Sequence, residues 1–250
     1  MKEQIIIAMP AKNASKTIAK SIESILSQKN VSREIILLIG NDESTDTTQE
    51  VITSFQPNSK IIVLPVSCGT AHGVRNLLND YIRNHFPNCV LIGRLDADDT
   101  LKSSTTLSQI EKLYDSIGFD ILFAGNQQKK ENQILEWENH STEKLLDDDY
   151  LLQRLKEMKE GNARAELPSC NTFIRPSIKV AYPPKISAED HWFSIELLLM
   201  KNEVKIHIAP NLIYCIYSLD GLESSTNSKN NHYIQSRIEL YQYFKSAITK

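Results

Sequence analysis

Residues 89–99 read Cys89-Val90-Leu91-Ile92-Gly93-Arg94-Leu95-Asp96-Ala97-Asp98-Asp99, an apolar run that ends in three carboxylates within four residues. The apolar run predicts a buried strand, so the carboxylates are expected at its C-terminal end, where open α/β sheets bind ligands. Clustered carboxylates repel one another unless a cation or hydrogen-bond donors compensate them. A divalent metal that carries a phosphorylated ligand would do this, because hard cations take oxygen ligands and share them with phosphates. The alternative is an acidic turn in water.

The first 125 residues alternate short apolar runs with amphipathic helical patterns. Asn13 or Ser15 is expected to cap the first helix, and Ser44 or Asp46 the second. Near-continuous apolar strands separated by helices predict an α/β fold, with a mostly parallel, Rossmann-like sheet covered by helices on both faces. Strands are predicted at 5–8, 35–39, 61–64, 90–95 and 121–124.

Beyond residue 125 the pattern is less regular and predicts a mixed C-terminal half. Residues 221–231 are rich in Ser and Asn and are expected to be mobile. The predicted organisation is one domain over 1–218, with halves 1–125 and 126–218, followed by this mobile segment and a helix within 219–250. The predicted elements are a hairpin or loop over 127–138, helices over 142–159 and 191–201, a strand over 167–174, two pairing strands over 204–208 and 212–217, and a final helix with Ile234, Ile238, Tyr241 and Ile248 on one face.

Composition excludes several classes of protein. The chain has 250 residues, 41% hydrophobic and 24% charged, with a net charge of −3, so no global positive field favours nucleic acid. No apolar run reaches the roughly 18 residues that a membrane span needs, and no secretory signal is visible. We therefore expect a cytoplasmic protein, with peripheral contact to the inner face of the membrane left open. The four cysteines form no CxxC pair, and Cys89 and Cys215 are expected as buried free thiols.

Several motifs occur in a fixed order at the ends of the predicted strands and helices. Together they resemble the family-2 inverting glycosyltransferases of the GT-A fold, over about residues 4 to 218. Each motif is weak alone, and the set in register is specific. The motifs are Pro10-Ala11-Lys12-Asn13, Ser24-Ile25-Leu26-Ser27-Gln28, Asn41-Asp42-Glu43-Ser44-Thr45-Asp46, Gly73-Val74-Arg75-Asn76, Leu95-Asp96-Ala97-Asp98-Asp99 and Ser187-Ala188-Glu189-Asp190-His191-Trp192.

The resemblance implies a nucleotide-sugar donor site in the N-terminal half. Pro10, Ala11 and Asn13 belong to a segment that the family uses for the base and ribose, although Pro10 also serves as an ordinary strand terminator. Asp42 is implied to accept a hydrogen bond from the nucleobase, with helix capping at this turn as the alternative. Arg75 is implied to contact the donor, and a surface arginine is the alternative.

The acidic cluster is implied to hold the diphosphate with a divalent metal, Mn or Mg. Asp96 is assigned to the ribose and the metal shell, and Asp98 to direct metal ligation. Asp99 supports the metal or caps the next helix. The resemblance also implies that Asp190 is the base that deprotonates the acceptor hydroxyl, with Glu189 and His191 on the acceptor side. The alternative role of Glu189 and Asp190 is helix capping, because two acids at a helix N-terminus interact favourably with the helix dipole.

The expected function is metal-dependent, inverting transfer of a hexose-type sugar, most readily from a UDP-sugar, to a glycan or lipid-linked acceptor, in bacterial-type surface glycan synthesis. A homodimer through the C-terminal helix is a further expectation. Many family members carry Arg or His after the final strands, near the diphosphate, but Tyr217 to Ser225 contains neither. Ser224 or Lys229 would be weak substitutes for these phosphate contacts. This departure keeps a non-catalytic nucleotide-sugar-binding subunit as an alternative. A sugar-phosphate nucleotidyltransferase is disfavoured because Pro10 to Asn13 lacks glycine.

Overall fold

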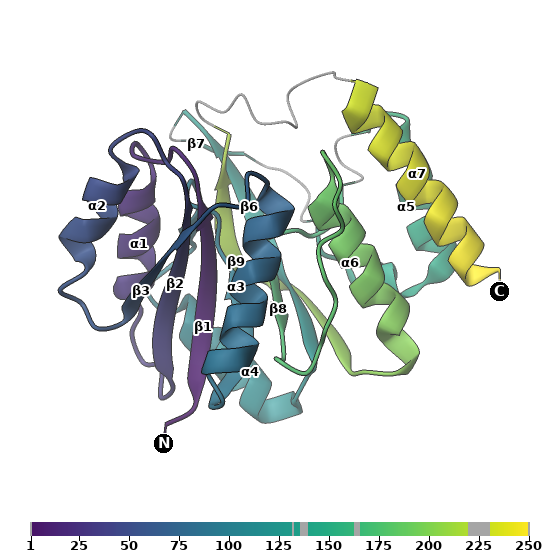
Figure 1. Ribbon diagram of the computed structural model, residues 1–250. Helices are drawn as coiled ribbons and strands as arrows, with labels where there is room; N and C mark the ends of the chain where they lie inside the picture. The colour runs from purple at the N-terminus through teal and green to yellow at the C-terminus, as the bar shows by residue number, and fades with distance from the viewer. Residues whose placement is uncertain (1, 132, 136–139, 163–165, 220–230, 250) are drawn as a thin grey trace.

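A computed structural model describes residues 2–131, 133–135, 140–162, 166–219 and 231–249 (Figure 1). These residues form one sheet of nine strands in the order β3-β2-β1-β4-β8-β6-β9-β5, with β7 paired to β6. The strands are β1 (Gln4–Ala11), β2 (Glu34–Asp42), β3 (Ile61–Val66), β4 (Cys89–Arg94), β5 (Thr100–Leu101), β6 (Ile121–Lys130), β7 (Gln133–Leu135), β8 (Thr172–Ile174) and β9 (Ile206–Ser218). The helices are α1 (Ile18–Leu26), α2 (Thr48–Phe55), α3 (Ala71–His85), α4 (Thr106–Ile117), α5 (Asp148–Lys159), α6 (Glu189–Leu199) and α7 (Asn231–Ile248), with short helical turns at Glu143–Leu146 and Met200–Asn202.

The sheet is mostly parallel, which confirms the predicted α/β fold class. Strands β1 to β4 pair in parallel, and so do β6 and β9. The mixed character comes from β8, which lies antiparallel between β4 and β6, and from the antiparallel pairs of β5 and β7. The five strands predicted in the N-terminal half all form, each extended by one or more residues beyond its predicted run or shifted at its ends.

Helices cover both faces of the sheet because successive strand residues point to opposite sides. In β1, Ile6 and Ala8 pack in a cluster with α3, α5, α6 and α7. Ile5 and Ile7 pack in the other cluster, with α1, α2 and α4. Figure 1 shows this arrangement, with α1 and α2 on one side of the sheet and α6 and α7 on the other. Burial on both faces explains why these strands are apolar at nearly every position.

The strand order creates a crevice at the carboxyl end of β1. Strand β1 lies between β2 on one side and β4 on the other, so the connections that follow β1 and β4 leave the sheet in different directions. Ligands of open α/β sheets bind at such a switch in strand order. The ends of β1, β2 and β4 therefore bring Pro10, Asp42 and Asp96 toward one place.

One prediction about helix starts is wrong, and one of the two alternatives for Asp99 is excluded. Helix α1 begins at Ile18 with Thr17 at its N-cap position, so neither Asn13 nor Ser15 caps it. Asn13 has a positive φ of 51°, and its side-chain oxygen accepts from the backbone N–H of Thr45, which joins two loops instead. Asp99 does not cap α4, which starts at Thr106. Asp46 does accept from the N–H of Thr48, the first residue of α2, so it satisfies one donor of that helix end.

Three further predictions fail in the C-terminal half. The two pairing strands predicted over 204–217 are one strand, β9, whose two parts both pair with β6, with register shifts around Gly125. Pro210 and the irregular register separate the two apolar runs, and this interruption is why the sequence pattern predicts two strands. The strand predicted over 167–174 is limited to β8. The helix predicted over 142–159 is split, because the Asp147 side chain accepts from Tyr150 N–H and starts α5 there.

Helix α7 packs on its own domain through a different face from the predicted one. The buried side chains are Ser236, Arg237, Leu240 and Phe244, whereas Ile234 is 46% exposed. Tyr241 and Ile248 only flank the core. Residues 127–138 begin as the β6–β7 hairpin. Of the predicted mobile segment, residues 221–230 lie outside the described residues, and Asn231 begins α7. Within the described chain, no helix is both long and apolar enough to span a membrane.

Candidate functional site

Two adjoining pockets lie at the carboxyl end of the sheet. The strand-end pocket has a volume of about 320 Å³ and lies between the loops after β1, β2 and β4 and the start of α3. The helix-side pocket, also about 320 Å³, extends from the acidic cluster to α6 and α7. Arg75, Asp96 and Asp98 line both pockets and therefore form their junction.

The structure brings all the predicted site residues to these two pockets. Those assigned to the donor and the metal line the strand-end pocket: Pro10, Ala11, Asn13, Asp42, Arg75, Asp96 and Asp98. Those assigned to the metal surroundings, the base and the acceptor line the helix-side pocket: Asp99, Glu189, Asp190 and His191. Their placement agrees with the expected division of tasks, and their roles remain predictions.

Asp42 ends β2 and organises the wall of the strand-end pocket. Its Oδ1 accepts from the backbone N–H groups of Cys68 and Gly69 at 2.7 and 3.1 Å, and Lys12 Nζ lies 3.2 Å from Oδ2. Burial acts to raise the pKa of the Asp42 carboxyl, but these hydrogen bonds and the lysine charge outweigh it and hold the pKa below its ordinary value. The ionised carboxylate thus fixes the loop before α3 and keeps Oδ2 toward the half-exposed Lys12.

Two arginines compensate the junction carboxylate Asp96. Its Oδ2 lies 2.8 Å from Arg94 Nη2 and 3.4 Å from Arg75 Nη2, and Arg75 also pairs with Glu189. Both guanidinium groups lie over the Tyr182 ring, at 5.5 and 5.8 Å from its centroid. Burial acts to raise the pKa of Asp96, but Arg94 and Arg75 reverse this and keep the carboxyl ionised. Predicted donor contact Arg75 is therefore a buried, paired arginine and not a surface one.

The other two acids of the cluster carry less compensation. Burial, and then the charge of Asp96, raise the pKa of Asp98 to about 6. Asp99 is buried, and accepts from Ser218 N–H at 3.0 Å and from the Cys170 thiol at 3.3 Å. Burial, followed by Cys170 and Asp98, raises the pKa of Asp99 well above its usual range. The cluster is therefore short of positive charge on the side away from the arginines.

This shortage fits a divalent cation. Among the described residues, the buried Oδ1 of Asp96 has no hydrogen-bond partner, and carboxylate oxygens are the ligands that Mg and Mn prefer. One ligand atom each from Asp96, Asp99 and Cys170 lie within 4.8 Å of one another. Burial raises the pKa of the Cys170 thiol well above its ordinary value, so this soft group stays protonated and the hard oxygens are the better ligands.

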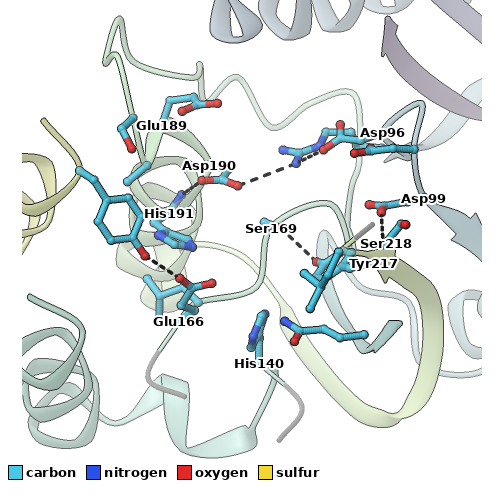
Figure 2. A pocket seen from close by; sticks show the side chains of 18 of the residues that line it. Asp96, Asp99, His140, Glu166, Ser169, Glu189, Asp190, His191, Tyr217 and Ser218 are labelled. Carbon is cyan, nitrogen blue, oxygen red and sulfur yellow. Dashed lines mark hydrogen bonds and ion pairs between the residues drawn. The ribbon is translucent and has the colours of Figure 1, made fainter. Parts of the chain in front are cut away.

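Asp190 lies in the first turn of α6, after Ala188, whose φ of 61° turns the chain into the helix. Its Oδ1 accepts from His191 N–H at 2.9 Å, and its Oδ2 lies 3.9 Å from Arg94 Nη2. Figure 2 shows Asp190 and Asp96 across the pocket from each other. Burial acts to raise the pKa of Asp190, but His191, Arg94 and Arg75 hold it well below its usual range. Asp190 is thus an ionised carboxylate.

Several lining residues were not predicted as site residues. Arg94 belongs to the apolar strand run and lines the helix-side pocket, and Tyr182, which lies beneath the guanidinium groups of Arg75 and Arg94, comes from a stretch with no recognised motif. The far end of the helix-side pocket is formed by Gln128, His140, Glu166, Tyr217, Tyr233 and Arg237. They come from five separate segments, so no spacing in the sequence connects them. Trp192, which ends the sixth motif, packs in the core. Cys215 is buried and free as predicted, whereas Cys89 is free but only half-buried.

A comparison with models of protein families identifies the family of this chain. The family model described as "Glycosyl transferase family 2" matches residues 6–179, more than half of the chain. The chain belongs to glycosyl transferase family 2. The predicted family and fold are therefore confirmed, and the matched range includes the strand-end pocket and the acidic cluster of this family 2 member. Among curated protein sequences, none matches the chain significantly.

Solved structures of similar fold include S. aureus TarS in complex with UDP-GlcNAc, with a TM-score of 0.72 and 16% identity over 98% of this chain and 66% of that one. The mannosyltransferase PcManGT from Pyrobaculum calidifontis, in complex with GDP-Man and Mn2+, has a TM-score of 0.58 and 13% identity, covering 100% and 65%. Glucosyl-3-phosphoglycerate synthase from Mycobacterium tuberculosis, in complex with UDP, gives 0.57 and 11%, covering 98% and 80%. This chain thus spans 60% to 66% of two TarS chains.

Proposed function

We propose that this protein is a metal-dependent inverting glycosyltransferase that moves a sugar from a nucleoside-diphosphate sugar to an acceptor hydroxyl. One observation carries the proposal. The two pockets meet at Asp96 and Asp98, and an ionised carboxylate, Asp190, lies in the second pocket beyond that junction. Such an arrangement separates a site for a charged leaving group from a base for the attacking hydroxyl.

The strand-end pocket suits the nucleoside of the donor. Asp42 presents an ionised carboxylate held by two backbone N–H groups, and its Oδ2 is the atom for a base N–H, since Lys12 is half-exposed and able to move. The solved structures of similar fold contain UDP, UDP-GlcNAc or GDP-Man, which supports a nucleotide sugar here. We propose a UDP-sugar as the first donor to test.

The reaction proceeds by direct displacement. Asp190 takes the proton of the acceptor hydroxyl, whose oxygen forms a bond to the anomeric carbon as the bond from that carbon to the diphosphate oxygen breaks. The nucleoside diphosphate leaves with the bonding electrons, so attack from the opposite side inverts the anomeric centre. Arg94 lies between Asp96 and Asp190 and keeps both carboxylates ionised and in place.

Asp98, with the free Oδ1 of Asp96, would hold the divalent cation. When bound, that cation supplies Lewis-acid compensation for the charge on the leaving diphosphate. Burial, and then the neighbouring Asp96 carboxylate, raise the pKa of Asp98, and a bound cation would offset both effects. The choice between Mn and Mg is left to measurement.

The acceptor and the cellular setting are also proposals. A hydroxyl of a glycan or of a lipid-linked sugar, bacterial-type surface glycan synthesis, a homodimer and a cytoplasmic location at or near the membrane all stay predictions. A nucleotide-sugar-binding subunit without catalysis is the rival, because the segment after Tyr217 lacks the basic residues that many family members have.

Carboxylate variants test the proposal. Asp98→Ala and Asp190→Ala should each lower the rate of sugar transfer by at least about 100-fold, since general-base and metal contributions reach that size. Where no acceptor is known, the rate of donor hydrolysis in the presence of Mn should fall by a similar factor. Release of the nucleoside diphosphate is the measurement. The matched control is Asp149→Ala, which removes an exposed aspartate of α5 away from both pockets. Full activity of either site variant would refute its assignment, and donor binding without turnover over a broad acceptor panel would favour the binding subunit.

A further inference from the structure

The far end of the helix-side pocket forms a polar lobe made by Gln128, His140, Glu166, Ser169, His191 and Tyr217. Figure 2 shows His140 and Glu166 at the opposite end of the view from Asp96, with His191 and Asp190 between them. A ligand in this lobe would therefore approach Asp190 from the side away from the metal-binding carboxylates.

His140 is the clearest sign of a ligand. Its side chain is 2% exposed, and among the described residues neither ring nitrogen has a hydrogen-bond partner. Its backbone is fixed on both sides, because its N–H donates to Asn126 Oδ1 at 3.2 Å and its carbonyl accepts from Arg154 at 3.1 Å. Buried polar groups without partners cost free energy, so a rigidly held imidazole with two free nitrogens indicates that something else supplies the hydrogen bonds.

Two more buried polar atoms lack partners in the same lobe. The Oε1 atom of Gln128 and the Nδ1 atom of His191 make no hydrogen bond within the described structure, and both residues are less than one-tenth exposed. A neutral imidazole both donates and accepts, an amide oxygen accepts, and a hydroxyl can pair with any of them. The set thus matches a ligand that carries several neighbouring hydroxyl groups.

The charges in the lobe argue against an anionic ligand. Glu166 Oε1 accepts from Arg237 Nη2 at 2.9 Å and from the Tyr233 hydroxyl at 3.0 Å, so the one arginine at this end is already paired. Arg75 and Arg94 are paired with Asp96 and Glu189, as described above. The described cations that line the pocket are thus all paired, and none is left to compensate a phosphate.

The remaining hydroxyls are already oriented. Tyr217 donates to Asn171 Oδ1 at 2.8 Å, which leaves its oxygen to accept from Ser169 at 3.0 Å. Glu166 lines the pocket and receives the hydrogen bonds of Tyr233 and Arg237 on Oε1, so among the described contacts Oε2 is left to accept from a ligand. A carboxylate oxygen is a good acceptor for the hydroxyls of a neutral sugar.

We propose that the polar lobe binds the acceptor as a neutral sugar residue, whose hydroxyls pair with His140, Gln128 and His191. The inference rests on the proposed function, because only a transferase has an acceptor to place beside Asp190. It goes beyond that function by naming the acceptor class, an unphosphorylated sugar, and the residues that select it.

Ligand-observed NMR on the full chain tests the lobe directly. The probes are p-nitrophenyl glycosides of common neutral sugars and the matching sugar phosphates, each added in the presence of UDP and Mn2+. We expect at least one neutral glycoside to bind, and to bind more tightly than its phosphorylated counterpart. Tighter binding of the phosphorylated sugar would overturn the proposal, and so would UDP binding with no response from any neutral glycoside.

Variants then locate the bound glycoside. His140→Ala and Gln128→Leu should each raise its Kd about fivefold or more, the effect of a lost hydrogen bond to a buried partner, and should leave the Kd of UDP unchanged. Gln128→Leu keeps the volume of the side chain, so it remains informative if His140→Ala folds poorly. The matched control is His85→Ala, an exposed histidine at the end of α3.

The main alternative occupant of this lobe is the sugar of the donor, and the same variants distinguish the two. If His140→Ala and Gln128→Leu weaken binding of a UDP-sugar relative to UDP and leave the glycoside unaffected, the lobe holds the donor sugar and the proposal is wrong. Failure of the wild-type protein to bind any nucleoside diphosphate contradicts the proposed function itself. Failure to bind a neutral glycoside while UDP still binds contradicts the lobe alone.

Discussion

Arg94 contacts two carboxylates of the site at once, Asp96 at 2.8 Å and Asp190 at 3.9 Å. It is 6% exposed, and its guanidinium also lies over the Tyr182 ring. An arginine suits this position because its planar group can serve several acceptors and stack on an aromatic face at the same time. The strand that leads to the acidic cluster thus carries a buried cation of its own, which compensates Asp96 together with Arg75.

Replacing Arg94 should therefore cost more than replacing an ordinary arginine. Arg94→Met leaves Asp96 and Asp190 without their shared partner, and an uncompensated buried charge costs about 3–5 kcal/mol. The free energy of unfolding in urea measures the loss. Arg175→Met is the control, because its pair with Asp120 is 49% and 26% exposed and such pairs contribute at most about 1 kcal/mol. Equal losses in the two variants would show that Arg94 is not needed to compensate the site.

The acids of the site are predictable from the sequence because they lie within short motifs. Asp42, Asp98 and Asp190 each lie at the end of a strand or the start of a helix with recognisable neighbours, and the structure brings them to the two pockets. His140 and Tyr182 are not predictable in this way, because their roles depend on contacts with distant segments. Their side chains would read as ordinary core or loop residues in any local pattern.

At the scale of elements, the N-terminal half was predictable and the C-terminal half was not. Strands β1 to β4 are parallel and buried on both faces, so each is a clear apolar run between helices. Strand β8 has only three residues and lies between β4 and β6, although it comes about eighty residues after β4 in the chain. Its position depends on pairing across the sheet, and no periodicity in Thr172–Ile174 encodes it.

The contact between β4 and β8 gives a prediction for Gly93. A Cβ atom built on Gly93 would collide with the Phe173 ring, which is fully buried. Gly93→Ala should therefore lower the free energy of unfolding by about 1–3 kcal/mol, the usual cost of overpacking a core. Urea unfolding measures it, with Ser116→Ala on the exposed side of α4 as the control, where a change below about 0.5 kcal/mol is expected. An unchanged Gly93→Ala protein would mean that the ring has room to shift.

For the whole molecule, the C-terminal half supplies the second wall of the site. Helices α6 and α7 and the segment near Glu166 close the helix-side pocket, while strand ends, loops and helix α3 of the N-terminal half form the strand-end pocket. Arg237 on α7 is 2% exposed and pairs with Glu166, so the last helix is joined to the pocket by a buried ion pair. This explains why α7 buries a face with an arginine in it, which an apolar pattern could not predict.

The buried histidine of this wall makes overall stability depend on pH. Burial, together with His191 and Arg154 and against the charges of Glu166 and Asp190, lowers the pKa of His140 to about 4. Between pH 4 and the ordinary pKa of about 6.5, the unfolded chain binds a proton at His140 more readily than the folded chain does. The contribution of His140 to the free energy of unfolding is therefore fully present above about pH 6.5 and is lost as the pH falls toward 4.

The size of this effect follows from the two pKa values. Between about pH 7.5 and pH 5, the free energy of unfolding should fall by about 2 kcal/mol more in the wild type than in His140→Gln, which cannot titrate there. Urea unfolding of both proteins at the two pH values isolates this difference from the carboxylates, which both proteins share. Parallel pH profiles for the wild type and His140→Gln would show that folding does not lower the pKa of His140, and would contradict a buried imidazole without hydrogen-bond partners in the polar lobe.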